Sequence, residues 1–265
     1  MADHFKNKVA WITGASAGIG EALAMALASQ GAALVLSARN KEALEKVAKK
    51  CLDAGAASVF VQPMDLTNAA GFKTIASQIK LRMGSIDLLV NSGGVSQRSL
   101  VKDSPMELYR QLMEINFFGT VALTKAVLPF MTDNKSGQII TISSLVGKIG
   151  SPLRSGYAAG KHALHGFFDS LRAEVQDDNI KVLMVCPGFI KTNISINALD
   201  ASGQSTGKMD ENQESGMLPS DLAKKVLAAV VVGKQEIYVG GKETLILYVK
   251  RFFPKMVNRI VRRKH

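Results

Sequence analysis

The chain has 265 residues, of which 47% are hydrophobic and 21% are charged. This size and composition predict one ordinary globular domain, and they exclude a disordered chain, a disulfide scaffold and a second large domain. The net charge of +11 is concentrated at the C-terminus, because residues 250–265 hold seven Lys or Arg and no acid. The rest of the chain is only weakly basic, so its charge favours no particular partner.

Cysteines and histidines give no metal-binding pattern. Cys51 and Cys186 lie far apart and match no CxxC or zinc spacing, and the four histidines form no ligand set. The sequence therefore predicts no metal site and two buried thiols in a reducing compartment. Because no long apolar run precedes residue 9, we expect no signal peptide or membrane-spanning helix, and a cytoplasmic protein.

Short β-branched runs alternate with helical stretches along the chain. The predicted strands are 8–12, 33–37, 58–62, 86–91, 137–143, 181–186 and 236–239. The predicted helices are 18–30, 41–54, 68–83, 106–132, 155–178 and 219–232. Most strands lack alternating polarity, which indicates burial on both faces. The pattern predicts a single-domain α/β Rossmann fold, a doubly wound seven-stranded parallel sheet with helices on both faces.

A glycine-rich turn follows the first predicted strand directly. Residues 13–20 read Thr-Gly-Ala-Ser-Ala-Gly-Ile-Gly, and an alanine-rich helix follows. A helix N-terminus offers unpaired N–H groups, and glycine lets a pyrophosphate approach where a Cβ would obstruct it. Between a strand and a helix, the turn predicts a dinucleotide phosphate site. Its candidate residues are Gly14, Ser16, Gly18, Ile19 and Gly20.

The end of the second predicted strand bears on the choice of dinucleotide. An acid there would bind the adenosine ribose 2′-hydroxyl and repel a 2′-phosphate. This chain has Ser37-Ala38-Arg39-Asn40 and no acid. Because an arginine fork can bind a phosphate, Arg39 predicts a preference for NADP(H) over NAD(H). The alternative is that Arg39 is a solvated surface residue.

Tyr157 and Lys161 lie four residues apart in a predicted helix, so they share a face. A tyrosine with its ordinary pKa of about 10 is a poor proton donor at neutral pH, and a nearby ammonium brings that pKa toward the working range. Such pairs also occur by chance on helix surfaces. Ser144, which closes a strand thirteen residues before Tyr157, and Asn116 on the preceding helix make the four residues a candidate catalytic set.

Five motifs then fall in order, and together they resemble those of the short-chain dehydrogenase/reductase family over about residues 8–240. The motifs are Thr13 to Gly20; Asp65-Leu66; Asn91 to Gly94; Ser144 with Tyr157 and Lys161; and Pro187-Gly188 followed by Thr192. Residues 91–99 and 161–164 resemble the orphan member 7 type and its 11β-hydroxysteroid dehydrogenase relatives. Three positions depart from the family pattern: Ser92 and Gly93 stand for Asn and Ala, and Gly160 stands for serine.

The resemblance implies hydride transfer between a nicotinamide dinucleotide and a carbonyl. It implies that Tyr157 donates the proton, that Ser144 holds the carbonyl oxygen, and that Lys161 lowers the tyrosine pKa and binds the nicotinamide ribose. Asn116 would support a water that relays protons to Lys161. The other implied cofactor contacts are Asp65 and Leu66 at the adenine, Asn91 and Gly93 on the adenosine side, and Pro187, Gly188, Ile190 and Thr192 at the nicotinamide carboxamide.

Two segments fall outside the strand and helix alternation. Residues 193–217 are polar and loop-like, and we interpret them as a mobile cover over a binding cleft, with an idle surface insertion as the alternative. After Pro254, apolar residues form one helical stripe with basic residues largely opposite. The apolar stripe is Met256, Val257, Ile260 and Val261, and the basic residues are Lys255, Arg259, Arg262 and Arg263.

The basic helix has three interpretations. Through residues 250–265 it can lie on a membrane surface, pack across the substrate cleft, or contact a partner subunit. No nucleic-acid reading motif accompanies the charge, so we expect no nucleic-acid binding. We assign residues 1–240 to the dinucleotide-binding and catalytic domain, and residues 241–265 to a basic amphipathic extension of it.

The sequence therefore predicts an NADPH-dependent oxidoreductase with Tyr157 as general acid and base. Its predicted substrate is a small apolar ketone, aldehyde, steroid or retinoid, or the corresponding alcohol. The alternatives are a non-catalytic NADP(H)-binding regulatory protein and an acyl-thioester ketoreductase. The resemblance implies a homodimer or homotetramer.

Overall fold

The computed structural model describes residues 4–262 and centres on one sheet of seven parallel strands. The strand order is β3-β2-β1-β4-β5-β6-β7. The strands are β1 (Val9–Thr13), β2 (Ala33–Ser37), β3 (Ser58–Val61), β4 (Leu88–Asn91), β5 (Gly137–Ile142), β6 (Ile180–Pro187) and β7 (Glu236–Val239). The order changes direction between β1 and β4, and in doubly wound sheets ligands bind in the crevice outside the strands' carboxyl ends at that point.

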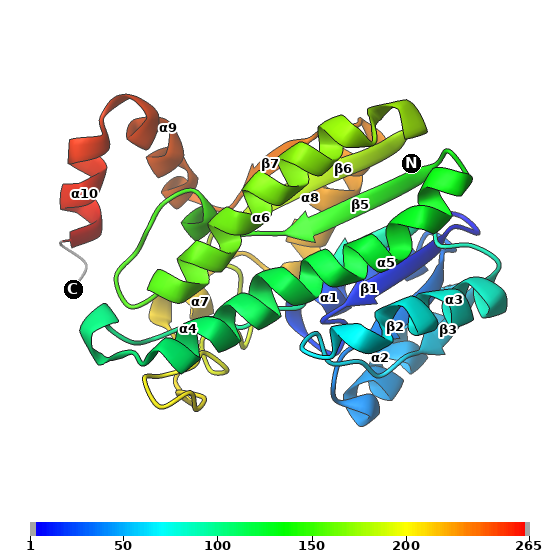
Figure 1. Ribbon diagram of the computed structural model, residues 1–265, viewed down its shortest axis with the longest axis horizontal. Helices are drawn as coiled ribbons and strands as arrows, with labels where there is room; N and C mark the ends of the chain where they lie inside the picture. The colour runs from blue at the N-terminus through cyan, green and yellow to red at the C-terminus, as the bar shows by residue number, and fades with distance from the viewer. Residues whose placement is uncertain (1–3, 263–265) are drawn as a thin grey trace.

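Helices cover both faces of the sheet (Figure 1). On one face lie α1 (Gly18–Ala28), α2 (Lys41–Asp53) and α8 (Pro219–Val231). On the other face lie α3 (Phe72–Met83), α5 (Gly119–Asp133) and α6 (Ser155–Glu174). Side chains of one strand alternate between the two cores: Ala10 and Ile12 pack toward α1, whereas Val9 and the fully buried Trp11 pack toward α5. The predicted α/β fold is confirmed.

The long helix predicted over residues 106–132 is interrupted by a wider turn. It consists of α4 (Met106–Met113), a π-helical turn (Glu114–Phe118) and α5. Its span, Met106–Asp133, is long and apolar enough to cross a membrane by length and composition. In this fold Leu123 and Val127 of α5 are fully buried in the core. Packing against the sheet therefore accounts for the apolar composition.

The segment that follows β6 folds back over the carboxyl end of the sheet. Isolated β-bridges pair Leu199 with Gln97 and Met217 with Ile190. A short helix, α7 (Glu211–Glu214), lies within it, and Ala198 is fully buried. Residues 193–217, predicted as a cover over a binding cleft, do line the main cleft, and these backbone pairings hold the segment to the body. We call residues 193–217 the cover.

Two short helices end the described chain, α9 (Leu245–Phe252) and α10 (Pro254–Arg262). They project at the end of the molecule that also holds α7 (Figure 1). The helix predicted after Pro254 is confirmed, and α9 is an addition. Within the predicted apolar stripe Val257 is buried, whereas Met256 and Ile260 are 46% and 40% exposed. Arg263 and the last residues of the predicted membrane segment lie outside the described residues.

Candidate active site

A cleft of about 1630 Å³ opens at the carboxyl ends of the strands. Its walls combine the glycine-rich turn, the strand ends, the cover and the C-terminal helices. Predicted cofactor residues that line it are Gly14, Ser16, Gly18, Ile19, Gly20, Arg39, Asp65, Leu66, Gly93, Pro187, Gly188, Ile190 and Thr192. Ser144, Tyr157 and Lys161 line the same cleft. The fold thus brings together residues that lie up to 178 positions apart in the chain.

The glycine-rich turn forms a tight backbone cradle. Gly14 has φ +64°, and a Cβ there would lie 2.9 Å from the backbone nitrogen of Gly93. A Cβ on Gly20 would lie 2.2 Å from the carbonyl oxygen of Gly14. Ala17, the N-cap of α1, offers no side-chain hydrogen bond, which leaves the first N–H groups of the helix for a ligand. A cradle of this shape and polarity fits a dinucleotide pyrophosphate.

One hydroxyl ties this cradle to the neighbouring strand. Thr13 Oγ1 accepts hydrogen bonds from the backbone N–H groups of Ser92 and Gly93, both over 3.1 Å. It also donates to the carbonyl oxygen of Val90 over 3.3 Å. The ends of β1 and β4 are therefore held in register at the place where the strand order changes direction.

Two predicted site residues lie behind the cleft wall. Asn91 is buried, and its Nδ2 donates to the hydroxyls of Thr124 and Thr141 over 3.1 and 3.4 Å. Its position therefore indicates a role in holding β4, β5 and α5 together. Asn116 lies in the π-helical turn, where its Nδ2 donates to the carbonyl oxygens of Val95 and Leu112, each over 3.0 Å.

Asn116 nevertheless stays close to the candidate catalytic lysine through its other amide atom. Asn116 Oδ1 accepts the N–H of Val95 over 3.1 Å. A Cβ built on Gly94 would lie 2.7 Å from Asn116 Oδ1 and 3.5 Å from Lys161 Nζ. The two groups flank the same glycine, and a π turn of this kind often marks a functional position in a helix.

The hydroxyl of Tyr157 forms a hydrogen bond with Ser144 inside the cleft. Burial raises the pKa of Tyr157 above its ordinary value, while the Arg154 guanidinium, the Ser144 hydrogen bond and the Arg98 guanidinium each lower it. Ser144 also accepts the N–H of Val146 over 3.3 Å, which fixes its hydroxyl oxygen. Tyr157 and Ser144 therefore form a positioned pair that can hold and protonate an oxygen atom.

Lys161 lies one turn further along α6, and its Nζ donates to the carbonyl oxygen of Ile142 over 2.8 Å. The ammonium is 5.8 Å from the centre of the Tyr157 ring. Burial lowers the pKa of Lys161 to about 8. Lys161 therefore loses its proton at a lower pH than an ordinary lysine does, and it lies beside the candidate proton donor.

Several residues in or behind the cleft wall carry no signal in the sequence. Gln97 Oε1 accepts the N–H groups of Gly156 and Tyr157 over 2.7 and 3.3 Å, and so anchors the first turn of α6. Glu243, from the C-terminal extension, accepts the N–H of Phe189 over 3.1 Å. Arg98 and Arg154 also line the cleft. No spacing rule connects such residues, because they meet only after the sheet has formed.

His165 of α6 is buried. Its Nε2 lies 3.0 Å from Ser143 Oγ, and its Nδ1 lies 3.7 Å from Glu236. His165, Cys186 and Glu236 each offer one possible metal-ligand atom, and these three atoms lie within 4.8 Å of one another, although the sequence predicts no metal site. Lys148 forms an ion pair of 2.8 Å with Glu236, so the carboxylate already has a cation.

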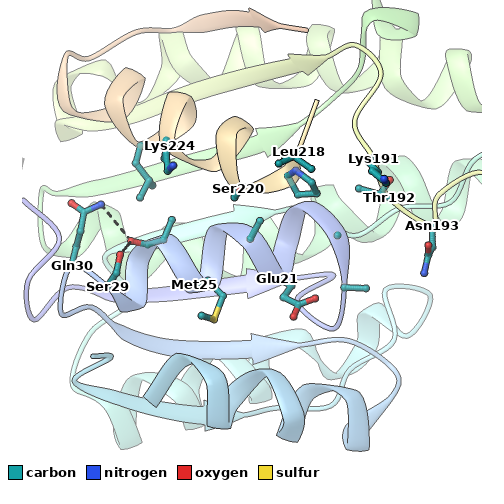
Figure 2. Close-up of a pocket in the computed structure, with 16 residues that line it drawn as sticks. Glu21, Met25, Ser29, Gln30, Lys191, Thr192, Asn193, Leu218, Ser220 and Lys224 are labelled. Atoms are coloured by element: carbon teal, nitrogen blue, oxygen red, sulfur yellow. Dashed lines mark hydrogen bonds between the residues drawn. The ribbon is translucent and has the colours of Figure 1, made fainter. Parts of the chain in front are cut away.

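A second groove, of about 960 Å³, runs between α1 and α8 (Figure 2). Glu21 and Met25 line it from α1, Gln30 from the turn after α1, and Lys224 from α8. It meets the main cleft at Thr192 but includes none of the four catalytic candidates. The main cleft is therefore the candidate active site.

The chain belongs to the short-chain dehydrogenase family. The family model described as short chain dehydrogenase matches residues 8–202, which include all four catalytic candidates. This membership makes the protein an oxidoreductase of the dehydrogenase and reductase type, with a fold that binds a nicotinamide cofactor.

Named relatives place the chain more narrowly. It is 38% identical to the mouse dehydrogenase/reductase SDR family member 7B, over 97% of this chain and 81% of that protein. It is 40% identical to the human member 7, over 94% of this chain and 75% of that protein. A member 7-like protein of Anopheles gambiae is 44% identical, over 89% of this chain and 76% of that protein.

Two solved structures share the fold. A short-chain dehydrogenase from Streptomyces avermitilis superposes with a TM-score of 0.83 at 28% identity, over 95% of this chain and 94% of that one. An alcohol dehydrogenase from Thermococcus sibiricus, complexed with 5-hydroxy-NADP, gives a TM-score of 0.77 at 28% identity, over 89% and 97%.

Proposed function

We propose that the protein is an NADPH-dependent reductase, or an alcohol dehydrogenase in the reverse direction, for a small and largely apolar carbonyl compound. The observation that supports this proposal is the hydrogen-bonded pair of Tyr157 and Ser144 in the cleft that also holds the glycine cradle. When bound, the cofactor supplies or accepts the hydride. The protein's own residues supply orientation and the proton.

Each catalytic candidate has a distinct task in this proposal. Ser144 holds the carbonyl oxygen of the substrate, and the Tyr157 hydroxyl donates the proton to that oxygen. Lys161 contacts the nicotinamide ribose and favours the phenolate that remains, since an ammonium stabilises a nearby anion. Asn116 supports a water that relays protons toward Lys161. Arg154 and Arg98 add to the stabilisation of the phenolate, because each lowers the pKa of Tyr157.

Arg39 underlies the proposed preference for NADPH over NADH. It lines the cleft beside Ala38 and Asn40, at the end of β2 where the adenosine ribose of a dinucleotide lies in such folds. An Arg39→Asp variant removes the phosphate contact and adds a carboxylate that repels a 2′-phosphate. We expect the NADPH to NADH ratio of kcat/KM to fall by more than tenfold. An unchanged ratio would exclude Arg39 as the selecting residue.

The apolar wall of the cleft supports the proposed substrate class of ketones, aldehydes, steroids and retinoids. Apolar side chains come from the loop after β5, the cover and the C-terminal helices. They are Leu145, Val146, Ile149, Leu199, Leu245, Ile246, Val249, Ile260 and Val261. The C-terminal extension therefore packs along the cleft, which is one of the three interpretations of its sequence.

The decisive test is NADPH oxidation by the wild-type protein and by Tyr157→Phe, over a panel of apolar ketones, quinones, retinal, steroids and acetoacetyl thioesters. We expect turnover of at least one apolar carbonyl, and a loss of about 10²- to 10⁴-fold on removal of the hydroxyl. Turnover of thioesters alone would favour the acyl-thioester alternative. Tight NADPH binding without turnover of any compound, and without an effect of Tyr157→Phe, would favour a cofactor-binding regulator.

We also propose that the outer face of the C-terminal helices contacts a membrane surface. Tyr248, Phe252 and Phe253 are 59%, 74% and 62% exposed, and they lie next to Lys250 and Arg251. Exposed aromatic and basic side chains together favour anionic lipid interfaces. Sedimentation with anionic liposomes tests this, with a chain lacking residues 250–265 as control. If both forms remain in the supernatant, the membrane contact is excluded.

A homodimer or homotetramer is the assembly that we propose, because members of this family often oligomerise. Light scattering of the purified protein measures the mass directly. A mass close to the 28.4 kDa of one chain at all concentrations would exclude the assembly.

A further inference from the structure

Two arginines meet one aspartate on the substrate side of the cleft. Arg98 and Arg154 each donate to the same Oδ2 atom of Asp210, over 3.1 and 3.2 Å. All three side chains are about four-fifths buried, with 18%, 18% and 21% of their surface exposed. Two positive charges therefore share a single negative charge. The surplus positive charge lies where water can compensate for it only in part.

The guanidinium donors are also not all used. Arg98 donates to Ser96 and to the carbonyl oxygen of Gln97 as well as to Asp210. For Arg154, Asp210 is the only hydrogen-bond acceptor among residues 4–262, although a guanidinium offers five N–H groups. Because Arg154 lines the cleft, its remaining donors are available to a ligand bound there.

The backbone holds Arg154 in this position. The preceding residue, Leu153, has φ +63°, a conformation that residues with a side chain rarely adopt. Its carbonyl oxygen accepts the N–H of Ser99 over 3.1 Å, so the two arginine-bearing segments are directly bonded. Local strain of this kind is often found at binding and catalytic sites.

Other acids on the cleft wall do not neutralise the arginines. Asp65 accepts hydrogen bonds from a neighbouring threonine, and Glu243 accepts two backbone N–H groups. Within the described part of the chain, neither carboxylate forms an ion pair with Arg98 or Arg154. Asp210 is therefore the only acid paired with these arginines there.

The arginine pair lies beside the candidate proton donor. Arg154 precedes Tyr157 by three residues at the start of α6. Both guanidinium groups lower the pKa of Tyr157, against the burial that raises it, which shows that they act on the phenol. Apolar side chains such as Leu199 and Ile246 line the same cleft. A carbonyl held at Tyr157 therefore has cations and an apolar wall within the same cleft.

We propose that Arg154, assisted by Arg98, binds a carboxylate of the substrate. The substrate class is then an amphipathic keto acid, or the corresponding hydroxy acid, with its carbonyl at Tyr157 and its apolar body on the cleft wall. This assignment rests on the proposed reductase activity. An arginine fork binds a carboxylate through parallel N–H···O bonds, and the surplus charge of the pair is balanced when the acid binds.

Matched acids and esters test the assignment by kinetics. The probes are ω-benzoylalkanoates of increasing chain length, each beside its methyl ester, with NADPH as the reductant. We expect wild type to favour the best acid over its ester by about 10- to 100-fold in kcat/KM, because a charge-assisted hydrogen bond is lost in the ester. Arg154→Gln should remove most of that ratio by raising the KM of the acid, whereas the loss of phenolate stabilisation should lower kcat for acid and ester alike.

Two further variants separate charge from structure. Arg110→Gln, a control at an exposed position on α4, should leave the acid to ester ratio unchanged. Asp210→Asn should raise the ratio, because it removes the competing carboxylate. If Asp210 only fastened the cover to the body, this variant would instead slow acid and ester equally. An acid to ester ratio near unity in wild type, or one insensitive to Arg154→Gln, would overturn the anion site while the reductase activity stands.

Equilibrium binding keeps the proposal testable without turnover. Calorimetry measures the affinity of a non-reactive ω-phenylalkanoate for the full-length protein in the presence of NADP⁺. We expect Arg154→Gln to weaken this binding by about tenfold or more and Arg110→Gln to leave it unchanged. Equal affinity in wild type and Arg154→Gln overturns the carboxylate site. If no ketone is reduced but the carboxylate binds through Arg154, the proposed reductase fails and the anion site stands.

Discussion

The two ends of the cleft are built by different means. The cofactor end, residues 13–20 with Gly93, is made of backbone: a helix terminus, and glycines against which a side chain would clash. The substrate end is made of side chains that reach the cleft from α6, the cover and the C-terminal helices. A backbone cradle accepts the part common to all dinucleotides, whereas the side-chain end can be changed without disturbing the cradle. A substitution at the substrate end should therefore impair catalysis without weakening cofactor binding.

The largest expected effect comes from removing one hydroxyl at the substrate end. Ser144→Ala deletes the hydrogen bond to Tyr157 and the group that holds the substrate oxygen. We expect kcat to fall by about 10²- to 10³-fold. NADPH affinity, measured by fluorescence titration, should stay within twofold. Ser170→Ala, an exposed hydroxyl on α6 that bonds only to its own helix, is the matched control. An equal loss of cofactor affinity in Ser144→Ala would contradict the independence of the two ends.

Lys161 lies where the two ends of the cleft meet, and its ionisation should change how the unfolding free energy depends on pH. Its pKa is about 8 in the folded chain, against 10.5 ordinarily, because it is buried. Between these values the unfolded chain binds more protons, so this residue makes the unfolding free energy rise with pH by about 3 kcal/mol.

Comparison with a variant isolates that contribution. Burial raises the pKa of the Cys51 thiol to about 11, which makes stability fall above pH 9 and opposes the lysine. Wild type and Lys161→Met both contain this thiol, so its contribution cancels when their denaturant titrations, done without cofactor, are compared. The unfolding free energy of wild type should rise relative to that of the variant as pH rises from about 8 to 10.5. Parallel curves would show that Lys161 keeps an ordinary pKa in the folded protein.

At the cofactor end, a single methyl group should be enough to damage the cradle. In Gly20→Ala the Cβ would lie 2.2 Å from the Gly14 carbonyl oxygen, so the turn must shift. We expect a loss of about 1 to 3 kcal/mol in unfolding free energy and at least a tenfold weaker NADPH affinity.

The same substitution in an open helix position is the control. Gly166 lies in α6, and a Cβ there would meet no atom within 4 Å. Gly166→Ala should therefore stabilise the protein by up to about 1 kcal/mol, without a change in cofactor affinity. If both variants bind NADPH equally well, the close approach at Gly20 is not what forms the cradle.

The smallest effect should come from a helix cap next to Arg39. Asn40 Oδ1 accepts the N–H of Ala43 over 2.9 Å and caps α2. Asn40→Ala should cost about 1 kcal/mol of stability, and Asn40→Ser, which keeps a capping oxygen, should recover most of it. Cofactor affinity should change by less than threefold in both. A larger loss in Asn40→Ala that Asn40→Ser does not restore would place Asn40 in the cofactor site itself.

Local patterns in the sequence were sufficient for the fold and for most of the site. All seven predicted strands and the six predicted helices are present, since buried parallel strands and amphipathic helices leave their periodicity in the chain. The glycine-rich turn and the Tyr157 to Lys161 pair were also identified, because each motif consists of residues that are close together in the sequence. The resemblance to a known family added the strand-end motifs and the separate roles of Ser144, Tyr157, Lys161 and Asn116.

Interactions between distant segments were not predictable. The burial of His165, the pairing of Leu199 with Gln97, and the meeting of Arg98, Arg154 and Asp210 all join segments from different elements. Asn91 was predicted as a cofactor contact from a motif alone, yet its side chain lies in a buried network with two threonines. A motif fixes the type of residue at a position and leaves open which way its side chain faces.

The sequence by itself determined the class of fold, the phosphate cradle and the candidate acid, because backbone geometry and helical spacing are short-range properties. Only the tertiary structure decided how the cover and the C-terminal helices close the cleft. It alone placed two arginines and one aspartate at the substrate end, because the energies of buried charges depend on partners that the chain brings together from more than 100 residues away.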